Sequence, residues 1–295
     1  DYDGLTMAKN SVANIVGTAG VPPTGLITYL TAQAYLDSEG APRDGRRSIV
    51  IEPFTSATIV DSLKGLFVPS DVIGKQYTKG MMGRDSAGAN WYMDQNVVSQ
   101  TFGSYSGKTL SVDTTSASFG IATGWAQTST ITLVASSSLT LNQGDTIQIA
   151  GVYGVNPQSR QSYGKLRNFV VTATTTVGTG GTSVTVSPAI ITGGQFQNVT
   201  VTSTSATAAV TPFNNTGTVS PQNIIMHRNA FTLATADLEL PDGVHFAGRA
   251  SDKDLGLSIR VVRQYTINND SIPTRLDVLY GWAPLYPELA CRVAA

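Results

Sequence analysis

Few residues of this 295-residue chain have types and spacings that could carry chemistry. The stretch GSYSGKT, residues 103–109, has the glycines, lysine and threonine of a phosphate-binding loop. That loop needs four residues between its glycines and a following helix whose N-terminus points at the phosphate. Only three residues separate Gly103 from Gly107, and LSVDTTSA after them lacks a helical pattern. We interpret the stretch as a β-turn with a surface lysine, Lys108.

Two histidines, His227 and His245, and one cysteine, Cys291, are the other candidates. Zinc sites and catalytic triads place a histidine beside carboxylates or a nucleophile. MHRN and GVHFAG show no spaced partner, so we expect a structural or surface role for both histidines. Cys291 is expected to be a small buried hydrophobe. The sequence predicts no catalytic residue, no metal site and no cofactor, and it leaves an enzyme with a histidine base as the least favoured class.

A third set of residues could bind a partner. RDGRR, residues 43–47, places three arginines in five positions, and guanidinium groups bind phosphate or carboxylate well. The same stretch could equally be a solvated loop after a helix. We keep Arg43, Arg46 and Arg47 as candidate contacts with another subunit.

Composition narrows the classes of protein further. The formal net charge is −1 and only 13% of residues are charged, against about 25% in an ordinary soluble protein. No global electrostatic attraction to nucleic acid or an acidic membrane follows from this. One cysteine excludes an intrachain disulfide, and no apolar run is long enough to span a bilayer. Because the first residue is Asp1, we expect a processed or truncated product.

The first hundred residues predict mixed α and β elements. Two apolar sets follow helical spacing: Leu5, Ala8, Val12 and Ile15, and then Ile27, Leu30 and Ala34. The first set predicts the tail of a helix over residues 5–16. The second set predicts one face of a helix that Thr24 caps and Gly40 ends.

Three further elements complete this region. RRSIVIEPF, residues 46–54, predicts a short buried strand. Ile59, Leu63 and Leu66 predict one face of a helix over residues 55–67. Ser70 is expected to cap a short helix over residues 71–80.

From 101 to 220 the composition changes. This stretch holds 41 Ser and Thr but only six charged residues. Short alternating runs recur and predict an all-β sandwich or barrel with about six strands. The runs are TLSV, STITLVA, DTIQIAGV, NFVVTAT, SVTVSP and NVTVTSTSA. NQGD, residues 142–145, is the clearest turn, because Gly144 can adopt a positive φ before Asp145.

After residue 222 charge returns, and residues 255–268 and 272–284 each predict one long strand. The order is therefore mixed, all-β, then mixed again. That order suggests a β domain inserted into a host domain, and the fold class is α+β.

The C-terminal stretch resembles the end of tailed-bacteriophage major coat proteins, nearest to the type of the short-tailed phages of Salmonella. The matching positions are Asn223, Ile224, Phe231, Pro241, Leu279, Tyr280, Gly281 and Pro287. LNQGDTIQIAGV and the stretch after it are similar to the inserted β domain of that family. These positions are Gly144, Asp145, Ile147, Ala150, Gly151, Val152, Phe169 and Val171. The resemblance covers nearly the whole chain.

The resemblance implies a major capsid protein fold with axial and peripheral domains. A capsid core would be formed by residues 1–99 and 222–295, with a β-barrel or Ig-like domain inserted at 100–221. Most of the family's N-terminal arm, extended loop and spine helix is expected to be absent. The loop 153–168 becomes a candidate subunit contact through Arg160, Lys165 and Arg167. Gly144 and Asp145 are a candidate structural turn.

The implied function is self-assembly into an icosahedral phage or prophage head around double-stranded DNA. Expected partners are copies of the chain in pentamers and hexamers, with scaffolding and portal proteins, and no membrane. Assembly would occur in the host cytoplasm and end in the virion. The alternative from a different class is a sugar-binding β-sandwich module, such as a decoration protein or adhesin.

Overall fold

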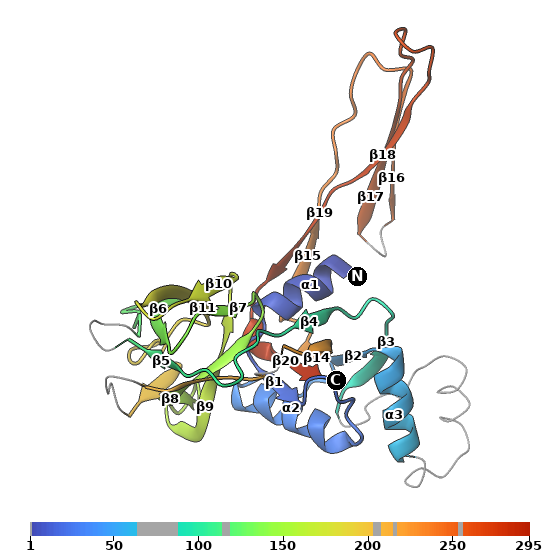
Figure 1. Ribbon diagram of the computed structural model, residues 1–295. Coiled ribbons are helices and arrows are strands. Elements are labelled where there is room, and N and C mark those ends of the chain that lie inside the picture. The colour runs from blue at the N-terminus through green and yellow to red at the C-terminus, as the bar shows by residue number, and fades with distance from the viewer. Residues whose placement is uncertain (1, 64–87, 114–118, 203–207, 215–216, 253–255) are drawn as a thin grey trace. The chain divides into compact units, whose positions relative to one another are not determined.

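The computed structural model describes residues 2–63, 88–113, 119–202, 208–214, 217–252 and 256–295. It is a mixed α/β structure that is mostly sheet with few helices, as Figure 1 shows. The chain forms two compact units. One comprises residues 1–230 with 286–295, and the other comprises residues 231–285.

The larger unit contains two large sheets, and the first of these has six strands. Its order is β1-β20-β14-β2-β3, and β4 also pairs with β14. The strands are β1 (Ile15–Gly17), β2 (Arg47–Ile51), β3 (Asn90–Met93), β4 (Ser99–Thr101), β14 (Val219–His227) and β20 (Ala290–Ala294). All five residues of β20 are buried, and β14 pairs with both β20 and β2. The C-terminal strand therefore lies inside the sheet, where it is surrounded by strands from distant parts of the chain.

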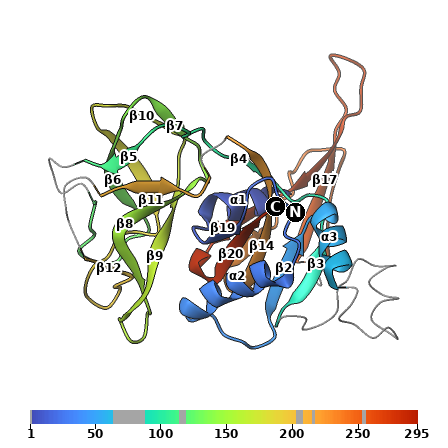
Figure 2. The ribbon, with the colours of Figure 1, turned by 60° about the horizontal axis from the view of Figure 1, so that its bottom comes forward.

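The described part of this unit has three helices, α1 (Tyr2–Ser11), α2 (Leu26–Ser38) and α3 (Pro53–Leu63). Figure 2 shows α2 and α3 beside the strands of the six-stranded sheet. The expected helix over 5–16 is wrong at its end, because the helix stops at Ser11 and Ile15 begins a strand. Ile15–Gly17 pairs in parallel with Arg292–Ala294, and that ladder satisfies the backbone better than another helical turn would.

The three residues predicted to share a face of α2 do share one, but it is the outer face. Tyr29, Ala32 and Leu36 are the buried residues of this helix. Ile27, Leu30 and Ala34 lie on the outer face, with 71% of Ile27 and 44% of Leu30 exposed. The helix is apolar on both sides, so periodicity alone could not tell which side meets the sheet.

The limits of α2 were predicted to within one residue. Gly25, not Thr24, is the N-cap, and no side chain bonds there. The end before Gly40 is confirmed, since Gly40 has φ +80° and the Ala41 amide donates to the Leu36 carbonyl at 2.9 Å. This is the left-handed glycine stop common at helix C-termini.

A seven-stranded sheet occupies most of the stretch between β4 and β14. Its order is β12-β8-β9-β11-β6-β5, and β13 also pairs with β8. The strands are β5 (Leu110–Val112), β6 (Ser129–Ala135), β8 (Thr146–Val155), β9 (Ser162–Val171), β11 (Thr182–Ser187), β12 (Val199–Val201) and β13 (Val210–Pro212). A two-stranded antiparallel sheet of β7 (Leu139–Leu141) and β10 (Thr175–Val177) lies beside it. The Val112 amide donates to the Ala208 carbonyl at 2.9 Å, so the two edges of the sheet meet.

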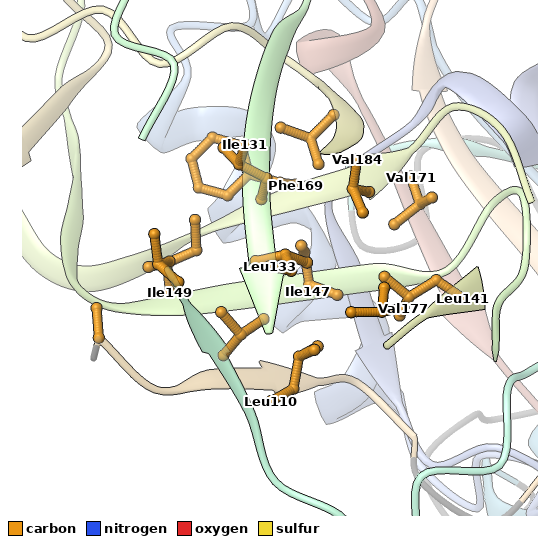
Figure 3. Packing of buried hydrophobic residues seen from close by; sticks show 14 of the residues in the cluster. Leu110, Ile131, Leu133, Leu141, Ile147, Ile149, Phe169, Val171, Val177 and Val184 are labelled. Atoms are coloured by element: carbon orange, nitrogen blue, oxygen red, sulfur yellow. The ribbon is translucent and has the colours of Figure 1, made fainter. Parts of the chain in front are cut away.

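This sheet encloses the larger of the hydrophobic clusters among the described residues. Ile131, Leu133, Ile147, Phe169 and Val184 are fully buried there, and Figure 3 shows them packed together. Each of the six alternating runs overlaps an observed strand, which confirms the β pattern. The short strands β7, β10 and β13 were not expected.

The smaller unit, residues 231–285, contains two separate sheets. β15 (Phe231–Thr235) pairs with β19 (Tyr280–Pro284), and β17 (Leu257–Arg263) lies between β16 (Phe246–Asp252) and β18 (Thr274–Val278). The prediction of one long strand over 272–284 was therefore wrong, because the chain leaves one sheet and enters another around Leu279. The cross-strand partners of the two halves differ, and this is not visible in the local pattern.

Several details complete the fold. A short 3-10 helix, Pro287–Leu289, leads into β20. The helix over 55–67 is confirmed as far as Leu63, with Ile59 buried, while Leu66 and the helix expected at 71–80 lie outside the described residues. None of the described helices is long and apolar enough to cross a membrane.

Candidate subunit-contact site

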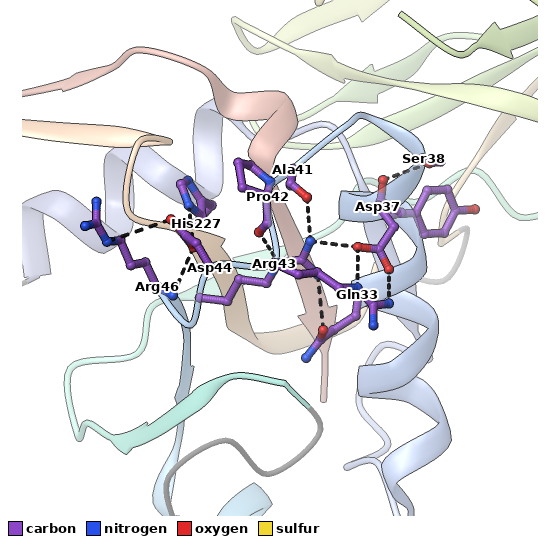
Figure 4. A network of polar contacts seen from close by, with 11 residues as sticks. Gln33, Asp37, Ser38, Ala41, Pro42, Arg43, Asp44, Arg46 and His227 are labelled. Atoms are coloured by element: carbon purple, nitrogen blue, oxygen red, sulfur yellow. Dashed lines mark hydrogen bonds and ion pairs between the residues drawn. The ribbon is translucent and has the colours of Figure 1, made fainter. Parts of the chain in front are cut away.

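The arginine loop before β2 is organised around one buried side chain. The Arg47 guanidinium is fully buried and donates to the carbonyls of Ala41 at 2.7 Å and Pro42 at 3.0 Å. It also donates to Gln33 Oε1 at 3.2 Å and Asp37 Oδ1 at 2.7 Å, and Figure 4 shows these two acceptors. These four bonds hold the loop against the C-terminal half of α2. Arg47 serves its own subunit, and we correct its assignment as a contact between subunits.

The other two arginines of this loop point outward. Arg43 pairs with the second oxygen of Asp37, and Arg46 lies 3.8 Å from Asp44. The two guanidinium groups on Asp37, with Arg43 contributing most, lower the pKa of that carboxyl. The side chains of Arg43 and Arg46 remain 72% and 63% exposed. They can therefore still reach a neighbouring molecule.

His227 ends β14 and is buried. Its Nε2 lies 3.2 Å from Asp44 Oδ1, and its Nδ1 accepts the Asn229 amide at 3.3 Å. The pair ties β14 to the arginine loop, which is the structural role expected of this histidine. His245 is exposed, as expected for a surface residue.

The three basic candidates at 153–168 lie in the turn after β8 (Arg160) and on β9 (Lys165 and Arg167), and they divide in the same way. Arg167 is buried and donates to Glu39 Oε1 at 2.7 Å, which joins β9 to the end of α2. Burial raises the pKa of Glu39, and the charge of Arg167 opposes that shift. Arg167 is therefore also corrected to an internal role. Arg160 and Lys165 are exposed, and Lys165 Nζ lies 5.6 Å from the Tyr35 ring centre.

The turn predicted at 142–145 is present in the structure. Gly144 has φ +88°, and the Asp145 amide donates to the Asn142 carbonyl at 3.0 Å. The Asp145 carboxylate is buried rather than exposed. It accepts bonds from the amides of Asn142 at 2.8 Å and Gly103 at 3.2 Å, from Gln100 Nε2 at 2.9 Å and from the Tyr105 hydroxyl.

Two cations extend this junction to the chain ends. Lys9 of α1 donates to Gln100 Oε1 at 2.8 Å. Arg292 of β20 donates to the Gly144 carbonyl at 2.9 Å and to Thr146 Oγ1, while burial lowers its pKa to about 10. Three segments distant in sequence thus converge on one turn. The arrangement can hold parts of a subunit together, but it presents no open site for a substrate.

The chemical candidates give no catalytic site. After Gly103 the chain makes a turn, with the Lys108 amide donating to the Tyr105 carbonyl at 3.0 Å, and then enters β5 instead of a helix. Lys108 Nζ donates to the Ser138 carbonyl at 2.6 Å. Cys291 is buried, and burial raises its thiol pKa. Within the described ranges no group of three His, Cys, Asp or Glu could hold a metal ion.

Sequence reasoning missed the partners of the buried charges. Asp37, Glu39, Gln100 and Tyr105 were not singled out, although each bonds a residue that was. One signal was present: Gly103 and Tyr105 both lie in the stretch that resembles a phosphate loop. A Cβ on Gly103 would lie 2.2 Å from the Tyr105 hydroxyl, so the glycine is needed for close packing there.

Comparison with known proteins shows the family of this chain. The family model described as "P22 coat protein - gene protein 5" matches residues 25–292. Among solved structures, one titled "CUS-3 coat protein I-domain" is 26% identical, with a TM-score of 0.25, and covers 36% of this chain and 95% of that one. No curated protein matches. The chain belongs to the P22 coat protein family, and it is a structural phage capsid protein that assembles with other copies into a shell, not an enzyme.

Proposed function

We propose that this chain is a major capsid subunit that forms an icosahedral phage head around double-stranded DNA. Scaffolding and portal proteins would guide assembly in the host cytoplasm. The observation that carries the proposal, beyond family membership, is the open apolar sheet of residues 231–285.

One face of the β16-β17-β18 sheet is apolar. Cross-strand pairing puts Ile259 opposite Val278 and Val261 opposite Leu276, and paired residues share a face. Phe246 lies on the same face at the end of β16, opposite Arg263. Leu276 is 70% exposed, and Phe246, Ile259 and Val278 are exposed as well.

The other face is polar and is partly covered by its own chain. Arg260 and Arg275 both bind the Asp277 carboxylate. Arg260 also donates to the Glu239 carbonyl at 2.6 Å, and Arg249 pairs with Asp237 at 3.4 Å. The segment that leads into β16 therefore contacts the charged face.

Within the described part of this unit, only Ser258 is buried. A three-stranded sheet usually needs a packed face for stability. Large exposed apolar patches mark surfaces that are covered by another protein segment. A subunit that is packed into a shell would supply that cover, so the open face supports assembly as the function.

We further propose a domain division with a capsid core at 1–99 and 222–295, in axial and peripheral parts, and an inserted β-barrel at 100–221. In support, the buried cluster from Tyr105 to Val210 is separate from the cluster that packs on the six-stranded sheet. The barrel would stabilise the subunit during folding. Residues 100–221 expressed alone should give a cooperative β-type thermal transition; a disordered spectrum would contradict the boundary and the role.

Four of the six basic candidates remain proposed contacts: Arg43, Arg46, Arg160 and Lys165. Their charged groups are exposed and can meet carboxylates of a neighbouring copy. The DNA would be enclosed without sequence-specific binding, and the net charge of −1 argues against tight binding of its phosphates by the shell.

The test is electron microscopy of the full-length gene product that contains this chain, expressed with and without its upstream neighbour gene. We expect closed shells or ring-shaped capsomers. Small monodisperse particles in both preparations would contradict the proposal. Sugar binding would then be measured on a glycan array.

A further inference from the structure

The junction at the Gly144 turn holds a lysine in direct contact with the side-chain amide of a glutamine. Lys9, on α1, places its Nζ 2.8 Å from Oε1 of Gln100, on β4. Gln100 is only 1% exposed, so its amide group is shielded from solvent. The carbonyl carbon Cδ lies one bond, about 1.2 Å, beyond Oε1. Rotation about the last bonds of the lysine side chain can therefore bring its nitrogen against that carbon.

The amide nitrogen of Gln100 has more acceptors around it than it has hydrogens. Nε2 lies 2.9 Å from Asp145 Oδ1, 3.1 Å from the Gln143 carbonyl oxygen and 3.3 Å from the Thr101 carbonyl oxygen. A planar amide nitrogen carries two N–H groups, so one of these acceptors is in excess. A tetrahedral, protonated nitrogen carries three. The three acceptors, of which one is a carboxylate, therefore fit this nitrogen better as it departs as ammonia than as part of an amide.

The surroundings of Lys9 favour the reactive form of its amine. Burial and the nearby charge of Arg292 lower the pKa of Lys9, while the charge of Asp145 opposes that shift. A lower pKa raises the fraction of neutral amine, which is the nucleophilic form. Arg292 is itself fully buried and is held in place by its bonds to the Gly144 carbonyl and to Thr146. Loss of the positive charge on Lys9 would remove a repulsion between two neighbouring cations.

We propose that Lys9 and Gln100 form an intramolecular isopeptide bond. The neutral amine attacks Cδ, so that a C–N bond forms and the C=O electron pair moves onto Oε1. That pair then returns, the Cδ–Nε2 bond breaks, and one proton passes from the attacking nitrogen to the departing one. One ammonia leaves for each bond formed, and no other reactant is consumed. The Asp145 carboxylate stabilises the positive charge that develops on the departing nitrogen.

The bond would fasten α1 to β4 at the Gly144 turn. Its two residues are 91 positions apart in the sequence, so the cross-link would restrict the unfolded chain and keep the helix from separating. The reaction occurs once in each chain and is a self-modification, not enzymatic turnover. It does not depend on the proposed role of the chain in a phage head.

The first test is the intact mass of the full-length gene product, purified folded and then denatured. We expect a mass below that of the sequence by about 17 Da, which is one ammonia. Trypsin should no longer cut after Lys9, and the fragment that runs through Lys9 to Arg43 should be joined to fragment 85–108. An unshifted mass would overturn the proposal. A shifted mass without the joined fragment would overturn it as well.

Variants then assign the bond to these side chains. Lys9→Arg keeps the positive charge but has no neutral amine to react, so the loss of about 17 Da should disappear. Lys108→Arg is the matched control and should keep the loss, because Lys108 Nζ donates to the Ser138 carbonyl and not to a side-chain amide. Persistence of the loss in Lys9→Arg would overturn the proposal.

The part assigned to Asp145 has its own test. Asp145→Asn keeps the size of the side chain and removes its charge. If the variant has the circular dichroism spectrum of the unaltered protein, we expect its joined fraction after equal incubation to be at least about tenfold lower. An equal joined fraction would overturn the role of Asp145. If the variant does not fold, the intact mass of the unaltered protein still decides whether the bond exists.

Discussion

Removal of the Asp145 carboxylate should destabilise the subunit far more than truncation of the neighbouring Gln143 side chain. Asp145→Ala leaves the amides of Gly103 and Asn142 and the hydroxyl of Tyr105 without their acceptor. Gln100 keeps the carbonyls of Gln143 and Thr101 as alternatives. The half-buried Lys9 and the buried Arg292 also lose a nearby negative charge.

The magnitude follows from these orphaned groups. A buried donor without a partner costs about 1–3 kcal/mol, so three donors cost about 3–9 kcal/mol. Burying the carboxylate is itself costly, and its removal offsets part of that sum. We expect a net loss of about 3–5 kcal/mol in the free energy of unfolding.

The assay is urea unfolding followed by circular dichroism at 25 °C and pH 7. Gln143→Ala is the matched control, because its side chain is exposed on the same turn and should change stability by less than about 0.5 kcal/mol. Tyr105→Phe, which removes only one of the donors, should fall between the two. A loss below about 1 kcal/mol for Asp145→Ala would refute the reasoning that this turn is a structural junction.

Three further predictions concern the arginine loop and β1. Arg47→Ala should lower the free energy of unfolding by about 3–5 kcal/mol, because it removes a buried cation and leaves Asp37 without one partner. Arg46→Ala, at an exposed position, should lower it by less than about 0.5 kcal/mol. Equal urea midpoints for the two variants would contradict this. The pKa of Asp37 is lower in the folded state than in the unfolded chain, so its contribution is present above about pH 4 and is lost as pH falls further. An Asp37→Asn variant should therefore lose less stability on acidification from pH 5 to pH 2 than the unaltered protein, and parallel pH profiles would count against the ion pairs. Gly17→Ala should lower the free energy of unfolding by about 2–3 kcal/mol, since Gly17 has φ +96° and a Cβ would lie 2.5 Å from the Ala294 carbonyl oxygen. Gly193→Ala is the control, because a Cβ there meets open space. Equal melting temperatures of the two variants would show that β1 is not tightly held.

The basic candidate contacts could be found from the sequence, but the sequence could not show which of them are buried and which are exposed. All six basic residues have the same chemistry, yet Arg47 and Arg167 are buried while Arg43, Arg46, Arg160 and Lys165 are exposed. The difference lies in their partners. Asp37 lies on α2 and Glu39 is its C-cap, and only the packing of that helix brings them to the arginines.

By itself the sequence determined the local features of this protein. The β character of 101–220, the turn at Gly144 and the end of α2 before Gly40 each follow from side-chain alternation or from a glycine's freedom at positive φ. The absence of a spaced catalytic set was visible in the same way.

Only the tertiary structure decided the features that depend on distant partners. Ile15 lies in a strand because β20 is beside it, and Tyr29 rather than Leu30 is buried because one of two apolar faces of α2 met the sheet. Asp145 became a buried acceptor because Gln100 and Tyr105 were brought to it. Local patterns fix which conformations a segment can adopt, but the energy that chooses among them comes from contacts whose partners lie far away in the sequence.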